Sequence, residues 1–168
     1  MKKKITLLTV FALTAVMLPT ICIGMVNASA SSSVSGTVMI IGYEELEILP
    51  KGNSDNIVMK VLLTAMFTGD IQGITTYEAI WILHTREVNF GANMHEKITF
   101  DTATVLGQSG SLTIEANMGS GRPADSVWHW TIIEGTGALA NLHGQGTWAP
   151  ENPGDFMEYY EGHVHFDP

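Results

Sequence analysis

Apolar positions along this chain come in short runs, and no long segment keeps the period of a helix. From residue 34 onward, runs rich in β-branched and aromatic residues each end at glycine, asparagine or proline. The pattern predicts eight β-strands, near Val34–Leu49, Asn56–Thr68, Ile74–Thr85, Glu96–Leu106, Ser111–Asn117, Ser126–Glu134, Gly146–Trp148 and Met157–Phe166. The segments 50–53 and 118–123 are turns by composition.

Eight strands joined by short turns have to manage the two edges of their sheet, and closure removes both edges. We therefore predict an all-β fold, a closed antiparallel eight-stranded β-barrel that occupies residues 36–168 as a single domain, after a short flexible lead at residues 31–35. In the strand Ile74–Thr85 both faces are largely apolar. Such a strand fits a wall covered by a core inside and by a partner subunit or a loop outside.

Residues 1–30 have the layout of a secretory signal. Three lysines at positions 2–4 precede an apolar run from Ile5 to Val26, and Ala28-Ser29-Ala30 is a small-x-small cleavage site. The apolar run spans 22 residues, which is long enough for a membrane anchor, although Pro19 interrupts it. Cleavage after Ala30 and retention as an anchor both place the rest of the chain outside the cytoplasm, secreted or held at the outer face of the cell membrane.

Composition excludes several classes of partner and site. Cys22 is the only cysteine, and Ile21 replaces the small residue that a lipoprotein signal requires before it. After residue 30 there is therefore no thiol for a disulfide, a nucleophile or a thiolate metal site. All 17 acidic residues but only five of the eight basic ones lie in that part, so its formal charge is −12. Such a surface repels nucleic acid and anionic lipid.

A series of glycine-containing motifs resembles a known family. The segments are Phe67–Gly73 followed by Tyr77-Glu78, then Gly107–Ser111, then Trp130 with Gly135–Ala140. In their order and approximate spacing they are similar to the motifs of a bacterial and archaeal family of unknown function. The resemblance covers roughly Gly36 to Phe166 and implies an eight-stranded barrel like that of allene oxide cyclase and the dirigent proteins. It implies no reaction.

One position departs from that family's pattern, in which Leu-Ala-Gly-x-x-Gly follows the strand of Trp130. This chain has Asn141 where the family has the first of those two glycines. Asparagine tolerates a positive φ better than most residues, so we expect Asn141 to hold the same left-handed turn.

Two residues are candidates for acid or base chemistry. Glu78 alternates in phase with Ile74, Ile80 and Ile82, and a carboxylate among isoleucines is either raised in pKa or paired with a cation. His129 alternates in phase with apolar residues of its own strand, where a hydrogen-bonded structural histidine is the commoner role. For both residues we favour the structural role over catalysis.

Histidines and tryptophans supply the remaining candidates. His163 and His165 occupy alternate strand positions and suit two ligands of a zinc or copper ion, with Glu161, His129 or His143 as a third. A solvated face is the favoured interpretation of this histidine pair, so no metal is expected. Candidates for contact with a ligand are Trp81, Trp130 and His143, although barrel aromatics are first of all core volume.

Three functions remain open at this stage. The favoured hypothesis is binding of a small, largely apolar molecule in the barrel mouth or lumen, with no cofactor. The second is a cofactor-free isomerase or cyclase in which Glu78 or His129 acts as acid or base. The third is an oligomeric structural protein of the envelope, with the apolar outer faces as a subunit interface between identical chains. On balance we favour a non-enzymatic role.

Overall fold

The computed structural model describes residues 30–50, 56–84, 91–121, 127–150 and 157–168. They form eight strands: β1 (Ser32–Pro50), β2 (Asn56–Gly69), β3 (Ile71–His84), β4 (Gly91–Val105), β5 (Gln108–Gly121), β6 (Trp128–Gly135), β7 (Leu142–Pro150) and β8 (Met157–Phe166). A short 3₁₀ helix, η2 (Gly137–Leu139), joins β6 to β7. All eight predicted strands are thus present. The predicted signal segment lies outside the described residues, apart from Ala30 at its end. No helix in the described part of the chain is long and apolar enough to span a bilayer.

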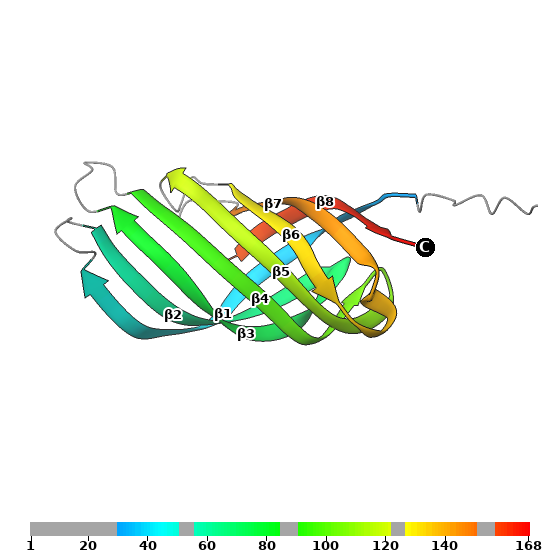
Figure 1. Cartoon of the computed structure of the whole chain (residues 1–168), viewed down its shortest axis with the longest axis horizontal. Coiled ribbons are helices and arrows are strands. Elements are labelled where there is room, and N and C mark those ends of the chain that lie inside the picture. The colour runs from blue at the N-terminus through cyan, green and yellow to red at the C-terminus, as the bar shows by residue number, and fades with distance from the viewer. Residues whose placement is uncertain (1–29, 51–55, 85–90, 122–126, 151–156) are drawn as a thin grey trace, which may run out of the picture.

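Each strand pairs antiparallel with its neighbours in the chain, and the sheet closes into a ring because β1 also pairs with β8. Figure 1 shows the strands running obliquely along the long axis. We call the end at which β1, β3, β5 and β7 finish the Pro50 end, and the opposite end, with the turns at Gly69 and Gly107, the Gly69 end. Each of the eight strands is paired on both sides, so closure removes the edges of the sheet.

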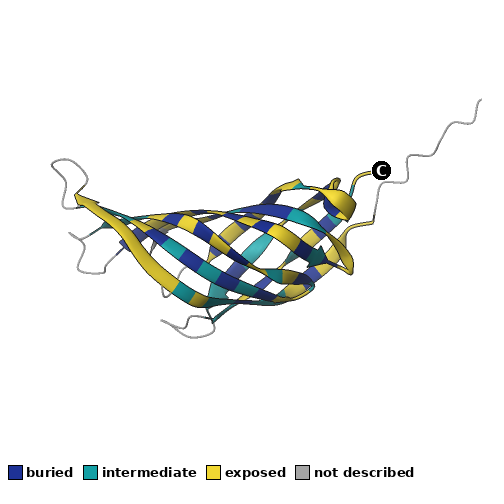
Figure 2. Cartoon of the chain, turned by 90° about the horizontal axis from the view of Figure 1, so that it is seen from below, coloured by how far each residue is buried: buried dark blue, intermediate teal, exposed yellow. Residues whose placement is uncertain are grey.

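The alternation of side chains gives the closed sheet an apolar inside and a polar outside, as the pattern of buried and exposed positions in Figure 2 shows. On β4, for example, Met94, Ile98 and Phe100 are buried while His95 and Lys97 are exposed. Near the Gly69 end the interior is filled by large rings. The rings of Phe67 and Phe100 meet edge to face with centroids 5.0 Å apart.

Glycines on the inner face make room for these large side chains. A Cβ on Gly146 or Gly162 would collide with the indole of Trp130, and one on Gly36 would collide with the phenol of Tyr160.

Strand β1 contains two bulges, since Ile41 and Leu46 have no partner in the β2 register. Bulges increase the bend and twist of a strand, and here they accompany the curvature of β1.

Several details differ from the prediction, including the starts of β4 at Gly91 and of β7 at Leu142. β1 begins at Ser32, and its residues 32–35 pair with β8, so the predicted flexible lead is part of the sheet. β5 continues to Gly121, over residues 118–121 of the predicted turn, because Met118 pairs with both Met94 and Trp128; residues 122 and 123 lie outside the described ranges. Asn141 is not in the left-handed region: among the described residues, the positive φ after β6 belongs to Gly137, at 61°.

Candidate functional site

The inner face of β4 carries a carboxyl group in the middle of its apolar side. Glu96 alternates in phase with Met94 and Ile98, and only 4% of its surface is exposed. Its register partners are Ala79 on β3 and Ala116 on β5, both fully buried. Glu96 is thus flanked in the sheet by two of the smallest side chains.

Two aromatic residues of β3 hold this carboxyl group. Tyr77 and Trp81 flank Ala79 at the diagonal positions, from which long side chains reach across a sheet. The Tyr77 hydroxyl donates to Glu96 Oε2 at 2.9 Å, and the Trp81 indole N–H donates to Glu96 Oε1 at 3.4 Å. Burial raises the pKa of Glu96 to about 7, although both hydrogen bonds and the charge of His95 oppose the shift.

A second carboxyl group enters the interior from β8. Glu158 is in phase with the buried Tyr160 and lies between Val38 of β1 and Pro150 of β7 in the sheet. Burial, followed by the charge of Glu96, raises the pKa of Glu158 to about 8, against a hydrogen bond from Trp128. Glu96 of β4 and Glu158 of β8 thus both lie in the inner phase of their strands and share the interior of the ring.

Besides burial, both acids raise the pKa of Tyr77. Its pKa is raised well above the usual value by burial, then by the charge of Glu96 and the hydrogen bond to it, and last by the charge of Glu158. Tyr77 and Glu96 come from the consecutive, paired strands β3 and β4, whereas Glu158 comes from β8, far along the chain. Closure of the sheet brings Glu158 into the same interior.

Two further tryptophans complete what we call the interior carboxyl site, made of Tyr77, Trp81, Glu96, Trp128, Trp148 and Glu158. Trp128 and Trp148 are register partners whose ring centroids lie 6.0 Å apart. The Nε1–H of Trp148 is buried and has no hydrogen-bond partner among the described residues. A buried N–H without an acceptor is uncommon, and each such group calls for an explanation.

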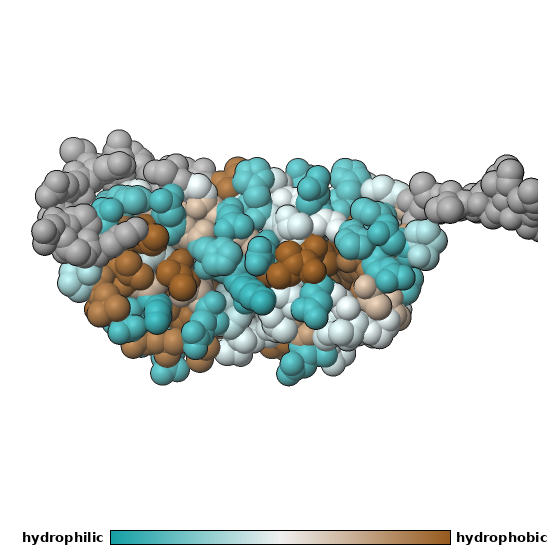
Figure 3. Space-filling view, viewed as in Figure 1, coloured by the Kyte–Doolittle hydropathy of each residue, from teal (hydrophilic) through white to brown (hydrophobic). Residues whose placement is uncertain are grey.

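The site continues toward the Pro50 end as an apolar mouth. Tyr43 and Ile48 of β1 have inner-phase register partners, Leu63 and Met59, yet about half of each β1 residue is exposed. The rings of Tyr43 and Trp81 lie 6.1 Å apart. Exposed apolar residues thus lead from solvent to the Glu96 hydrogen bonds. The space-filling view in Figure 3 shows hydrophobic side chains gathered over the surface at this end of β1–β3.

The two residues predicted for acid or base chemistry point the other way. Glu78 is exposed on the outer face of β3 beside Ile74 and Ile80, which are also exposed. His129 is exposed on the outer face of β6, where Ile133 is exposed as well. Neither side chain reaches the interior, so the closed sheet does not use them as an internal acid or base.

Both tryptophans that were predicted to contact a ligand have side chains on the inner face, but they differ in how far they are exposed. Trp81 is partly exposed and belongs to the interior carboxyl site. Trp130 is 1% exposed, lies under Gly146 and Gly162, and donates its N–H to the Thr147 carbonyl at 3.2 Å. Trp130 is therefore a packing residue in the wall of the ring.

The predicted histidine candidates all lie on the outer surface. His143 and His165 are register partners with rings stacked at 5.5 Å, and their Nε2 atoms lie 3.3 and 3.4 Å from the Asp167 carboxylate. His163 also faces outward. Within the described ranges, no three histidine, cysteine or acidic side chains are placed to hold a metal ion.

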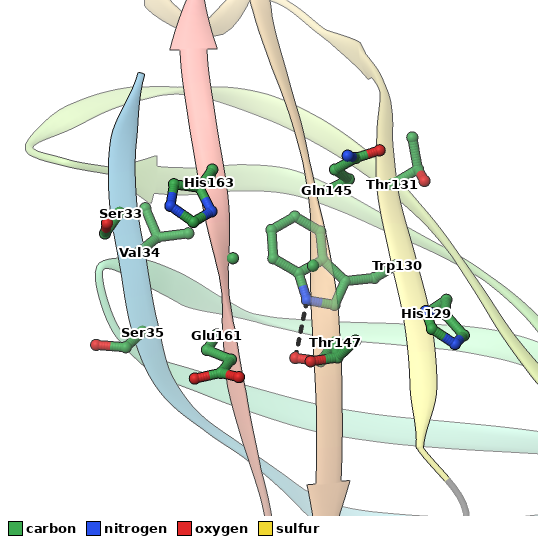
Figure 4. A pocket seen from close by; sticks show the side chains of 12 residues that line it. Ser33, Val34, Ser35, His129, Trp130, Thr131, Gln145, Thr147, Glu161 and His163 are labelled. Atoms are coloured by element: carbon green, nitrogen blue, oxygen red, sulfur yellow. Dashed lines mark hydrogen bonds between the residues drawn. The ribbon is translucent and has the colours of Figure 1, made fainter. Parts of the chain in front are cut away.

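Outside the ring, strands β1, β8, β7 and β6 form an open groove of about 810 Å³. Figure 4 shows its polar side chains, among them Ser35, Glu161, Thr147 and His129, on four neighbouring strands. The register places these four in one row across the sheet. The groove is open to solvent, and Trp130 and Val34 also line it, although both are almost fully buried.

Glu96 and Glu158 are the functional candidates that the sequence analysis missed. A readable signal existed for each, because an acidic residue stands in the apolar phase of an alternating strand. Glu96 falls between Met94 and Ile98, and Glu158 falls two residues before Tyr160. The predicted strand began at Glu96, which removed the preceding apolar positions from view.

Comparisons with known proteins identify the family and add no activity. The family model described as "Protein of unknown function (DUF3224)" matches residues 29–160. A DUF3224 protein of unknown function from Shewanella oneidensis MR-1 superposes with a TM-score of 0.65 at 17% identity, over 83% of this chain and 99% of that one. The pterocarpan synthase dirigent protein GePTS1 matches with a TM-score of 0.49 at 16% identity, over 83% of this chain and 92% of that one. No curated protein matches. The resemblance predicted from the motifs is confirmed, and the chain belongs to the DUF3224 family of proteins of unknown function.

Proposed function

We propose that the closed sheet acts as a barrel that binds a small, largely apolar molecule at its Pro50 end, against the interior carboxyl site. The observation that carries this proposal is the buried N–H of Trp148, which has no acceptor among the described residues and belongs to a ring packed against Trp128, the donor to Glu158. Ligand sites are typically apolar cavities with a few converging polar groups. A bound molecule with one oxygen acceptor would satisfy the Trp148 donor.

The sizes of the side chains along the interior also favour a ligand at the Pro50 end. Large rings, including Phe67, Phe100 and Tyr160, fill the region near the Gly69 end. Around Glu96 the direct neighbours are alanines. An eight-stranded barrel has an interior that side chains can just fill or that can hold one small ligand. The ring of Trp148 packs against both Phe67 and Trp128, so its unsatisfied N–H belongs to the region where these large rings meet the interior carboxyl site.

A pair of matched lysine substitutions tests the location. Ile48 is 49% exposed in the mouth, and Ile74 is 62% exposed on the outer face, so both Ile48→Lys and Ile74→Lys are expected to fold. The neutral fluorescent probe phenylnaphthylamine should bind the wild-type protein saturably. Ile48→Lys should weaken its binding by about tenfold or more, because a charge replaces apolar contact, whereas Ile74→Lys should not. Absence of saturable binding, or equal loss in both variants, would contradict the proposal.

A catalytic role is the second candidate, and one contact favours it. Glu96 has a pKa of about 7 and accepts a hydrogen bond from Tyr77 at 2.9 Å, which suits general acid or base catalysis near neutral pH. Glu96 would then remove a proton from carbon next to a carbonyl group. Wild type and Glu78→Gln should exchange the α-protons of phenylbutanone with deuterium faster than buffer, and Glu96→Gln should not. No exchange by wild type would remove this candidate.

Two expectations from the sequence remain proposals. The exposed outer isoleucines Ile74 and Ile80 are consistent with contact between identical chains. Light scattering of the purified protein tests this, and a monomer would contradict it. The extracytoplasmic location depends on residues 1–30, and detection of the protein in the extracytoplasmic fraction of its source cells is the direct test.

A further inference from the structure

The inner face around the interior carboxyl site carries acids but no cation among the described residues. The ionisable groups that face inward there are Tyr43 and Glu45 of β1, Tyr77 of β3, Glu96 of β4, and Glu158 and Tyr160 of β8. Lys60 pairs with Glu47 on the outside at 3.4 Å, and Lys97 is exposed on the outer face of β4. Two inward carboxyls, one buried and one partly buried, without a positive partner are unfavourable in their charged forms.

The same site is rich in rings that suit a cation. Trp81 donates to Glu96 and Trp128 donates to Glu158, Trp148 packs against Trp128, and Tyr43 lies against Trp81 at the mouth. The face of an indole attracts a cation, and the attraction strengthens where water is excluded. Aromatic rings and carboxylates together are the chemistry that recognises organic ammonium groups.

We propose that the molecule bound is a hydrophobic amine whose ammonium group sits between Glu96 and Glu158. This inference rests on the proposed function and names its ligand class. A primary ammonium group has three donors and can reach both carboxylates, while its apolar body lies against the tryptophan rings. An ether or hydroxyl oxygen on that body accepts from the Trp148 N–H, which has no other acceptor in the described structure.

The protonation of the two acids gives the amine a distinctive signature. In the free protein, burial raises the pKa values of Glu96 and Glu158, and the charge of Glu96 raises that of Glu158 further. An ammonium group between them favours the ionised forms and lowers both pKa values. Binding of an amine therefore releases protons near neutral pH, and its affinity rises as the pH increases through the pKa values of the carboxyls. A neutral ligand shows neither effect.

Three probes that differ only in their polar group test the inference: phenoxypropylamine, phenoxypropanol and phenoxypropionate. Titration calorimetry of the purified protein, in buffers with different ionisation enthalpies, gives the affinity and the number of protons released. At about pH 8 the amine should bind at least about tenfold tighter than the alcohol, and the anion should bind least. Glu96→Gln and Glu158→Gln should each reduce the preference for the amine, and the outer-face control Glu78→Gln should keep it.

The outcomes separate the inference from the proposed function. Equal affinity for amine and alcohol, with both weakened by Ile48→Lys, overturns the amine and leaves the proposed function standing. Failure of both of these probes and of phenylnaphthylamine to bind overturns the proposed function as well. If the glutamine variants do not fold, the wild-type pH series decides, because an amine affinity that stays constant from about pH 6 to about pH 8, without proton release, refutes the inference.

Discussion

The Glu96→Gln variant should become increasingly more stable than the wild type as the pH rises. The pKa of Glu96 is about 7 in the folded state and 4.5 in an exposed reference carboxyl. Between these values the unfolded chain releases a proton that the folded protein keeps, so the wild-type free energy of unfolding falls with increasing pH. The loss is complete above the folded pKa. Below about pH 4.5 the carboxyl is neutral in both states and makes no pH-dependent contribution.

The size of the effect follows from the shift. A difference of about 2.5 pKa units at about 1.36 kcal/mol per unit gives about 3 kcal/mol. Glu96→Gln has no proton to lose, and its amide oxygen still accepts from Tyr77. The variant should therefore match the wild type within about 1 kcal/mol near pH 4.5 and gain about 3 kcal/mol on it by about pH 8.

Urea unfolding, followed by tryptophan fluorescence and circular dichroism at several pH values in this range, measures the difference. The other carboxylates are common to both proteins and their contributions largely cancel, except that of Glu158: without the charge of Glu96 its pKa falls, which adds to the gain of the variant at high pH. Glu78→Gln removes the same charge from the exposed outer face of β3 and should run parallel to the wild type. A constant gap between wild type and Glu96→Gln across the whole pH range would refute the account of Glu96 as a buried acid that keeps its proton.

Two further substitutions test the packing of the closed sheet. Gly146→Ala should cost more than about 2 kcal/mol in urea unfolding, because its Cβ would overlap the Trp130 indole, whereas Gly119→Ala, with open space around it, should cost less than about 1 kcal/mol. Equal costs would contradict the packing. Tyr160→Phe should cost about 1–3 kcal/mol, since it leaves the buried Ile71 N–H, now 2.7 Å from the hydroxyl, without an acceptor. An unchanged midpoint in the same assay would show that this bond is dispensable.

The strands could be predicted because each is a local pattern. Alternation of polar and apolar residues located all eight, and the ends that differed lie where composition misleads. Met118 and Gly119 resemble the start of a turn, yet Met118 has apolar partners on both neighbouring strands that keep it in the sheet. At Asn141, the expected left-handed turn is made four residues earlier by Gly137, so asparagine needs no unusual backbone there.

The interior site could not be predicted in the same way, because it depends on which face of each strand turns inward. β3 has apolar residues on both faces, so the pattern alone leaves Glu78 and Tyr77 as equal candidates for the interior. The ring decides: Ala79, in phase with Tyr77, pairs with the buried Glu96. That Glu158 and Glu96 share one interior is even harder to predict from the sequence, since β4 and β8 are not neighbours in the sheet.

Burial of two acids in this interior runs against stability, and that is an argument for function. Each acid lowers the stability of the fold near neutral pH, and apolar residues of similar size at buried ionic positions are often neutral or stabilising. Strongly shifted carboxyls arise in structural networks too, but such networks satisfy their polar groups. Here the Trp148 N–H is left without an acceptor in the described structure, and the mouth beside it is half-exposed and apolar. A cost in stability together with an unfinished set of hydrogen bonds is the combination expected of a site that a ligand completes.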